Sequence, residues 1–167
     1  TLDVTTGSPT VTVSNSARTL TMTTPIAGAD GLTKAGAGTL VLNATNTYSG
    51  TTIITGGTLR LATSGAWGTS AGITMSTASN SLSLGVDSAL SLPALSGSSG
   101  AFTYTIVSDR ATAGAGLTHA FAASNLGNAT FATNAGSNVS SGTAGISFSG
   151  TTNMSGGSAG TVTLAPG

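Results

Sequence analysis

Apolar and polar residues alternate with a period of two in short stretches along most of the chain. In 39–42 the two leucines fall on one side of an extended strand, while Thr39 and Val41 fall on the other. The stretches 51–54 and 58–61 repeat this arrangement, and Gly-rich or Asn-rich corners separate them. One face of each strand is therefore apolar, and the sequence predicts a chain of short strands and turns.

The same alternation predicts further strands on both sides of this region, at 10–14, 19–23, 73–75, 81–84, 89–92, 101–107, 117–122, 129–133, 145–149 and 161–164. Four of the strands begin at 19, 39, 58 and 81, a recurrence of about 20 residues that is typical of one solenoid coil. A β-sandwich or barrel would show closer strand spacing and hairpin signals such as Asn-Gly, which the sequence lacks. We expect inward, stacked leucines at Leu20, Leu40, Leu42, Leu59, Leu61 and Leu82.

One stretch, 27–61, also resembles a known family. It contains Gly31-Leu32-Thr33-Lys34, Gly38-Thr39-Leu40, Asn46-Thr47-Tyr48-Ser49-Gly50 and Gly57-Thr58-Leu59 in this order. The combination resembles the autotransporter-associated β-strand repeat of passenger regions in bacterial surface proteins. Thr51 departs from the pattern, which would have a second glycine there. The resemblance implies a right-handed parallel β-helix and a location outside the cell or on the bacterial outer surface.

We therefore predict an all-β protein built as a right-handed parallel β-helix. Residues 1–95 would form coils that contain the repeat at 27–61. From 96 to 167 the periodicity weakens and the strands carry all four phenylalanines. Because larger inward side chains fill a wider interior, we expect this part to continue the helix with wider coils or a cap-like end.

Composition narrows the choice of partners. The 167 residues include four Lys or Arg and four Asp, with no Glu and no Cys, so the formal net charge is zero. Nucleic acids and anionic membrane surfaces are bound through clusters of Lys and Arg, so neither is an expected partner. No stretch is apolar enough to insert into a membrane. The first residues lack the features of a signal peptide, which is typical of a processed chain or a piece of a longer one.

Residues with catalytic chemistry are few. His119 is the only histidine, and without Cys or Glu it lacks the partners of a metal site or catalytic triad, so we expect it on a surface. A polysaccharide-cleaving enzyme needs two carboxylates about 5 to 10 Å apart. The spacing of the four aspartates, Asp3, Asp30, Asp87 and Asp109, does not indicate such a pair, and Asp30 and Asp109 have turn contexts. We predict no catalytic residue, cofactor or metal, and no enzyme.

The remaining candidates have structural explanations. Asn43 and Asn46 flank a corner, where stacked asparagine amides can bond the coils above and below. Tyr48, Tyr104 and Trp67 could stack on sugar rings, but they are scattered, and Tyr48 belongs to the repeat. Lys34 also belongs to the repeat and needs no further role.

These observations favour an extracellular structural or adhesive scaffold. A carbohydrate-binding adhesin module, a β-helical polysaccharide-degrading enzyme and a spacer without partners are the alternatives. Both ends of a β-helix expose unpaired backbone groups over an apolar core, and neither terminus of the sequence carries an evident polar cap. We therefore expect self-association end to end into fibres, or contact with further coils of the same parent chain, and surface glycans as a further class of partner.

Overall fold

A computed structural model describes residues 2–3, 7–98, 100, 102–127, 129–153 and 162–163. These residues form nineteen strands and no helix, and all the strand pairs are parallel. In this part of the chain, accordingly, no helix has the length and apolarity needed to cross a membrane. The all-β class and the parallel β-helix predicted from the sequence are confirmed.

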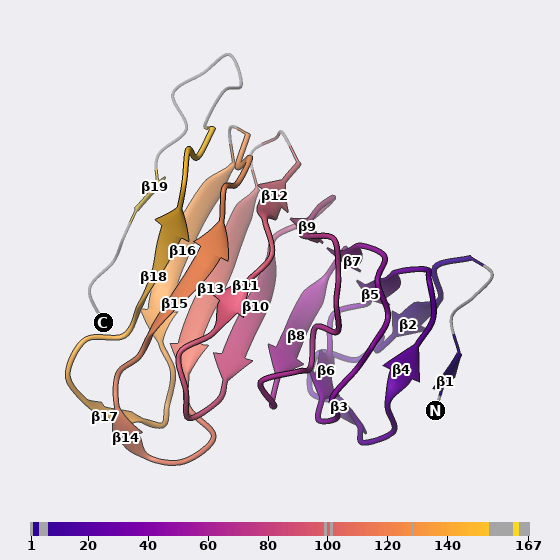
Figure 1. The fold of residues 1–167 in the computed structure, drawn as a ribbon, viewed down its shortest axis with the longest axis horizontal. Coiled ribbons are helices and arrows are strands. Elements are labelled where there is room, and N and C mark those ends of the chain that lie inside the picture. The colour runs from indigo at the N-terminus through magenta and orange to yellow at the C-terminus, as the bar shows by residue number, and fades with distance from the viewer. Residues whose placement is uncertain are drawn as a thin grey trace.

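The largest sheet has seven strands, each one turn of the solenoid from the next (Figure 1). In spatial order they are β3 (Thr19–Met22), β6 (Thr39–Leu42), β8 (Gly57–Leu61), β10 (Asn80–Gly85), β13 (Thr103–Asp109), β16 (Thr130–Ala135) and β19 (Val162–Thr163). The chain therefore makes six turns between β3 and β19. Strands that are distant in sequence lie side by side along the axis.

The other sheets follow the same stacking. A five-stranded sheet contains β2 (Thr10–Thr12), β5 (Leu32–Ala35), β7 (Thr52–Ile54), β9 (Ile73–Met75) and β12 (Leu95–Gly97). A three-stranded sheet contains β11 (Ser91–Leu92), β15 (Thr118–Ala122) and β18 (Gly145–Ser149). Two pairs complete the fold, β1 (Leu2–Asp3) with β4 (Ile26–Ala27) and β14 (Gly114–Ala115) with β17 (Val139–Ser141).

The register of the largest sheet confirms the predicted period. Thr19 pairs with Thr39, Thr39 with Thr58, and Thr58 with Ser81. The inward column Leu20, Leu40, Leu59, Leu82, Ile106 and Thr133 advances by 20, 19, 23, 24 and 27 residues. The proposed division between 1–95 and 96–167 stays a prediction, and β12 crosses that boundary.

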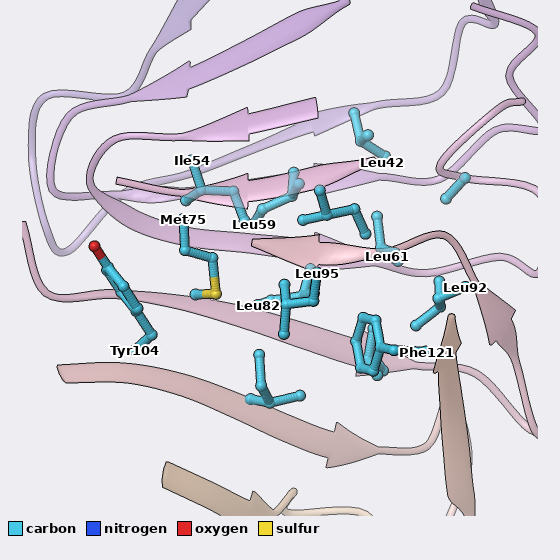
Figure 2. Close-up of a cluster of buried hydrophobic side chains, with 14 of the residues drawn as sticks. Leu42, Ile54, Leu59, Leu61, Met75, Leu82, Leu92, Leu95, Tyr104 and Phe121 are labelled. Carbon is cyan, nitrogen blue, oxygen red and sulfur yellow. The ribbon is translucent and has the colours of Figure 1, made fainter. Parts of the chain in front are cut away.

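The leucines of the central coils form the core, as predicted. Leu40, Leu42, Leu59, Leu61 and Leu82 are fully or almost fully buried. Figure 2 shows Ile54 and Met75 of the five-stranded sheet within the same cluster. Each such side chain contributes about 1.5–3 kcal/mol through burial.

Leu20 corrects the expected core. It pairs in register with Leu40, but its side chain is 44% exposed. The reason is its position, because β3 is the terminal strand of the seven-stranded sheet and no described strand lies on its other side.

Aromatic side chains fill the interior of the later coils. Tyr104 and Phe131 are register partners whose ring centroids lie 5.3 Å apart, and the Phe121 and Phe148 centroids lie 6.0 Å apart. The strands predicted beyond 100 are present with shifts of one or two residues at their ends. Residues 161 and 164–167 of the predicted final strand and uncapped terminus lie outside the described residues, as do Thr1 and Val4.

Candidate functional site

A cluster of charged side chains lies at the ends of three neighbouring strands of the seven-stranded sheet. Arg60 projects outward from β8, and its Nη1 atom lies 2.7 Å from Oδ2 of Asp109 at the end of β13. The same guanidinium donates to Ser83 Oγ at 2.9 Å and to the carbonyl of Arg110 at 3.1 Å. Asp109 Oδ1 accepts a hydrogen bond of 3.0 Å from the backbone N–H of Asn138. These contacts join side chains across three successive coils.

Two glycines allow these side chains to lie close to the backbone. A Cβ atom at Gly85 would stand 2.2 Å from Cζ of Arg60, and one at Gly136 would stand 2.1 Å from Cγ of Asp109. Gly85 sits between the two partners, on the strand that separates β8 from β13. The absence of a side chain there lets Arg60 cross an entire strand to reach Asp109.

A second ion pair extends the cluster. Arg110 Nε lies 3.2 Å from Asp87 Oδ1, and Asp87 also accepts hydrogen bonds from the backbone N–H groups of Ala111 and Thr112 and from the Thr112 hydroxyl. Arg110 Nη1 donates to the carbonyl of Ala115 in β14, and Asn138 Nδ2 donates to the carbonyl of Arg110. The cluster therefore fixes the base of the β14–β17 pair, which projects at the lower edge of Figure 1.

The electrostatics of the cluster do not suit acid catalysis. Burial alone would raise the pKa of Asp109, but other interactions outweigh burial and lower this pKa. They are the hydrogen bond from Arg60, the hydrogen bonds from the backbone N–H groups of Arg110 and Asn138, and the positive charge of Arg60. The N–H and hydroxyl of Thr112, with the Arg110 charge, likewise lower the pKa of Asp87. Both carboxylates are ionised at neutral pH, so neither holds a proton that a general acid would donate.

The structure brings two of the four aspartates to one corner, which their spacing did not indicate. Asp87 and Asp109 share Arg110 as a neighbour, whereas Asp3 lies in β1 and Asp30 is half-buried in a bend. The expected turn context of Asp109 is wrong, because this residue ends a strand and is buried in an ion pair. No metal-binding group of three or more His, Cys, Asp or Glu side chains occurs within the described residues.

Asn46 occupies the interior of a corner and joins three coils. Its Oδ1 atom accepts a hydrogen bond of 2.8 Å from the backbone N–H of Ile26, and its Nδ2 atom donates to the carbonyl of Ala66. Asn43, at the other side of the corner, is exposed. The predicted asparagine bridge between coils is therefore confirmed for Asn46.

Lys34 is fully buried, and its ammonium group donates to three carbonyls, those of Ala35, Gly36 and Gly56, at 2.8–2.9 Å. Gly56 belongs to the next coil, so Lys34 holds two corners together. Burial lowers the pKa of Lys34. Its place beside Leu32 in the alternation was a signal of this inward position, because both fall on the buried face of β5.

Tyr48 is part of another internal network. Its hydroxyl lies 2.7 Å from Thr52 Oγ1, and Ser70 Oγ accepts a hydrogen bond from the backbone N–H of Thr52. Burial raises the pKa of Tyr48 to about 12, although the Thr52 hydrogen bond opposes the shift. Tyr104 is also buried, and Trp67 is half-buried. Among the described residues, these aromatics form no exposed row for stacking on sugars.

His119 was expected on a surface, and the structure corrects this. The ring is fully buried in the three-stranded sheet, and Nδ1 accepts a hydrogen bond of 3.1 Å from the backbone N–H of Leu90. Its alternation with Phe121 was the missed signal, since both point inward from β15. Sequence reasoning placed a polar residue outside although its position in the pattern was an inward one.

A shallow hollow lies on the outer face of the seven-stranded sheet. Its volume is about 280 Å³, and it is lined by Gly57, Thr58, Ser79, Asn80, Ser81, Thr103 and Thr105. The side chains of Thr58, Ser81 and Thr105 form one outward column, since these residues are register partners. Hydroxyl groups dominate the lining and no charged residue contributes to it.

Comparison with known proteins supports the resemblance found in the sequence. Residues 32–61 match the sequence model of the passenger-associated-transport-repeat. A segment of 68 residues, 41% of the chain, is 47% identical to the "Adhesin BmaC autotransporter" of Brucella suis biovar 1 (strain 1330). The aligned segment spans about 2% of the length of that protein. No solved structure matches the chain. The autotransporter passenger repeat predicted at 27–61 is thereby confirmed.

Proposed function

We propose that this chain is a β-helical scaffold segment of an adhesin-like bacterial surface protein, exposed outside the cell, with no catalytic activity of its own. The observation that carries the proposal is the position of the passenger repeat. Residues 32–61 form strands inside two parallel ladders, with one described strand on their amino-terminal side and further strands on their carboxy-terminal side. A passenger repeat embedded in an uninterrupted solenoid suits a rigid, elongated support.

The internal contacts favour stiffness. Asn46 and Lys34 tie corners of successive coils together, and Arg60 reaches past one strand to Asp109. Such contacts resist bending and shearing between coils without disulfides, which a chain lacking cysteine cannot form. Asp87 and Asp109 are each held in an ion pair with an arginine, which supports a structural role for both.

Two measurements test this proposal. Antibodies raised against the chain should label intact cells that carry the parent protein, and labelling that appears only after permeabilisation would contradict surface exposure. The purified chain should release no products from neutral or acidic polysaccharides. Cleavage that disappears in an Asp109→Asn or Asp87→Asn variant would show that the chain is an enzyme after all.

Binding of neutral glycans is a second candidate function, favoured by the hydroxyl-lined hollow. Hydroxyl groups donate and accept hydrogen bonds, as sugar hydroxyls do, and an uncharged lining suits a neutral saccharide. A glycan array should then show a ligand for the native chain that is lost in a Ser81→Ala/Thr105→Val variant. Thr39→Val is the matched control, since Thr39 lies in the same outward column but does not line the hollow. Equal binding by all three chains would place the glycan elsewhere.

We also propose contact between copies through the end formed by β3. Leu20 is the one large apolar side chain exposed among the described residues, and the free edge of β3 offers backbone groups for pairing. With zero formal net charge, little repulsion separates copies. Light scattering over a concentration series should show association that Leu20→Asp weakens. A strictly monomeric native chain would instead leave this edge to further coils of the parent protein.

A further inference from the structure

His119 is an inward residue of the three-stranded sheet. It pairs with Ile146 of the next coil, and its ring receives the backbone N–H of Leu90 from the coil before. Because Nδ1 accepts this hydrogen bond, the imidazole is neutral and its proton resides on Nε2. Nε2 is buried and has no hydrogen-bond partner among the residues that the structure describes. The neutral form of the His119 ring thus holds Leu90 to the coil that follows.

Uncharged side chains perform the same task elsewhere in the solenoid. Asn46 Oδ1 accepts the N–H of Ile26, Ser70 Oγ accepts that of Thr52, and Ser124 Oγ accepts that of Leu95. In each case an inward polar atom receives a backbone N–H from the preceding coil. His119 is the member of this group that can take up a proton at mildly acidic pH.

Protonation would disrupt the contact. The imidazolium carries a proton on both nitrogens, so Nδ1 would meet the Leu90 N–H donor to donor. The charge would also lie in an apolar interior, between Leu90 and Ile146 and next to the Phe121 and Phe148 rings.

Among the described residues, the surroundings of His119 hold no group that would offset the charge. The inward residues of the packed strands are Leu92 of β11, Phe121 of β15, Ile146 and Phe148 of β18, Tyr104, Ile106 and Ser108 of β13, and Phe131 and Thr133 of β16. None of them is titratable in this range. The charged residues of these elements and their connections are Asp87, Asp109 and Arg110, which are engaged in the outer cluster with Arg60.

We propose that His119 is an acid-sensitive latch: its neutral ring holds β15 to the residue before β11, and its protonation releases this side of the three-stranded sheet. The chain makes the response specific, because the sequence contains one histidine, no glutamate and no cysteine. Between about pH 5 and 7, no other side chain has an ordinary titration range. The two partners of the outer cluster, Asp87 and Asp109, titrate at lower pH.

The direction of the pH response follows from the difference in the pKa of His119 between the closed and the open state. Burial lowers the pKa of His119 in the closed structure, whereas a ring released into water has an ordinary pKa of about 6.5. The open state therefore binds more protons, and the closed state loses stability as the pH falls below about 6.5. Opening should be nearly independent of pH above 7. At pH 5.5 it should be favoured about tenfold over pH 7.5, since ten of every eleven released rings are protonated there.

Amide hydrogen exchange on the full chain tests the latch. After correction for intrinsic exchange rates, opening at the Leu90 amide should increase about tenfold from pH 7.5 to 5.5. The Ile26 amide, which is bound to Asn46, serves as the internal reference and should show no such increase. In His119→Asn, an amide oxygen replaces Nδ1 as acceptor, as in Asn46, and the pH dependence at Leu90 should vanish.

Two outcomes would overturn the proposal. One is an unchanged Leu90 opening in the native chain between pH 7.5 and 5.5, and the other is an increase that persists in His119→Asn. If the variant does not fold, an NMR titration of the His119 ring in the native chain decides. An apparent pKa well below 6.5 is expected for the closed state, and a value of 6.5 or above contradicts the latch.

Discussion

Asn46 Oδ1 accepts a hydrogen bond of 2.8 Å from the backbone N–H of Ile26, a residue one coil earlier. The same side chain donates to Ala66, one coil later. A single buried amide therefore replaces ladder hydrogen bonds at a corner where the backbones of three coils turn. Each of these groups would be left without a partner if the amide were removed.

Asn46→Ala should therefore destabilise the chain by about 2–4 kcal/mol, because one buried N–H and one carbonyl lose their partners. Urea denaturation followed by circular dichroism measures the change. Asn43→Ala is the matched control, since Asn43 lies at the same corner but is exposed. It should change the stability by no more than about 0.5 kcal/mol. Equal effects of the two variants would refute the bridging role of Asn46.

Lys34→Met should also lower the stability, by roughly 2–4 kcal/mol, although it removes a buried charge. Methionine keeps the apolar stem, but the carbonyls of Ala35, Gly36 and Gly56 lose their common donor. Arg18→Met removes the same charge from an exposed position and should have little effect. Thermal melts of both variants under the same conditions make the comparison. A Lys34→Met chain as stable as the native one would mean that desolvation of the ammonium cancels its hydrogen bonds.

Leu42→Asp should unfold the central coils. Its side chain is 1% exposed and is stacked between Met22 and Leu61, so an unpaired carboxylate there costs several kcal/mol. That is comparable with the stability of a whole domain. Leu20→Asp places the same group on the terminal strand, where the native leucine is 44% exposed, and should cost less than about 1 kcal/mol in the monomer. Retention of the native melting temperature by Leu42→Asp would disprove the inward assignment.

Asp109→Asn should cost about 1–3 kcal/mol at neutral pH, because Arg60 loses its charged partner while a quarter of its side chain is still hydrated. The folded pKa of Asp109 is below its ordinary value, so the contribution of the carboxylate is present above about pH 4. It is lost as the pH falls through the folded pKa. Urea titrations should therefore show the difference between the native chain and the variant shrinking as the pH falls below about 4. A difference in stability that stays constant as the pH falls through the acidic range would argue against the ion pair.

The strands and the coil period were predictable because they depend on local alternation. Leucines spaced two apart in 39–42 and 58–61 mark the inward face, and the recurrence of this pattern gives the turn length. Asn46 was also predictable, since an asparagine at a corner has few other stabilising roles. The resemblance carried by 27–61 added the parallel direction of the strands.

The buried polar residues could not be placed by residue type. Lys34 and His119 fall on inward positions of β5 and β15, but lysine and histidine are residue types that are usually exposed. Burial is tolerated because backbone groups one coil away, at Gly56 and Leu90, are available as partners. The Arg60–Asp109 pair joins residues 49 positions apart, and its geometry depends on coil lengths that the sequence does not state.

The reach of Arg60 sets a limit on how such a chain can grow by duplication. A shift of 19 residues places β6 on β8, with threonine on threonine and leucine on leucine at three of the four pairs. A second copy of 39–57 would therefore stack on β6 and β8 with nearly the same side-chain pairs that these two strands already make with each other. The solenoid could lengthen there with little loss of stability. An extra coil between β8 and β13 would instead separate Arg60 from Asp109 and leave both charges partly buried. Over evolutionary time, added coils should therefore be tolerated between β6 and β8 and selected against between β8 and β13.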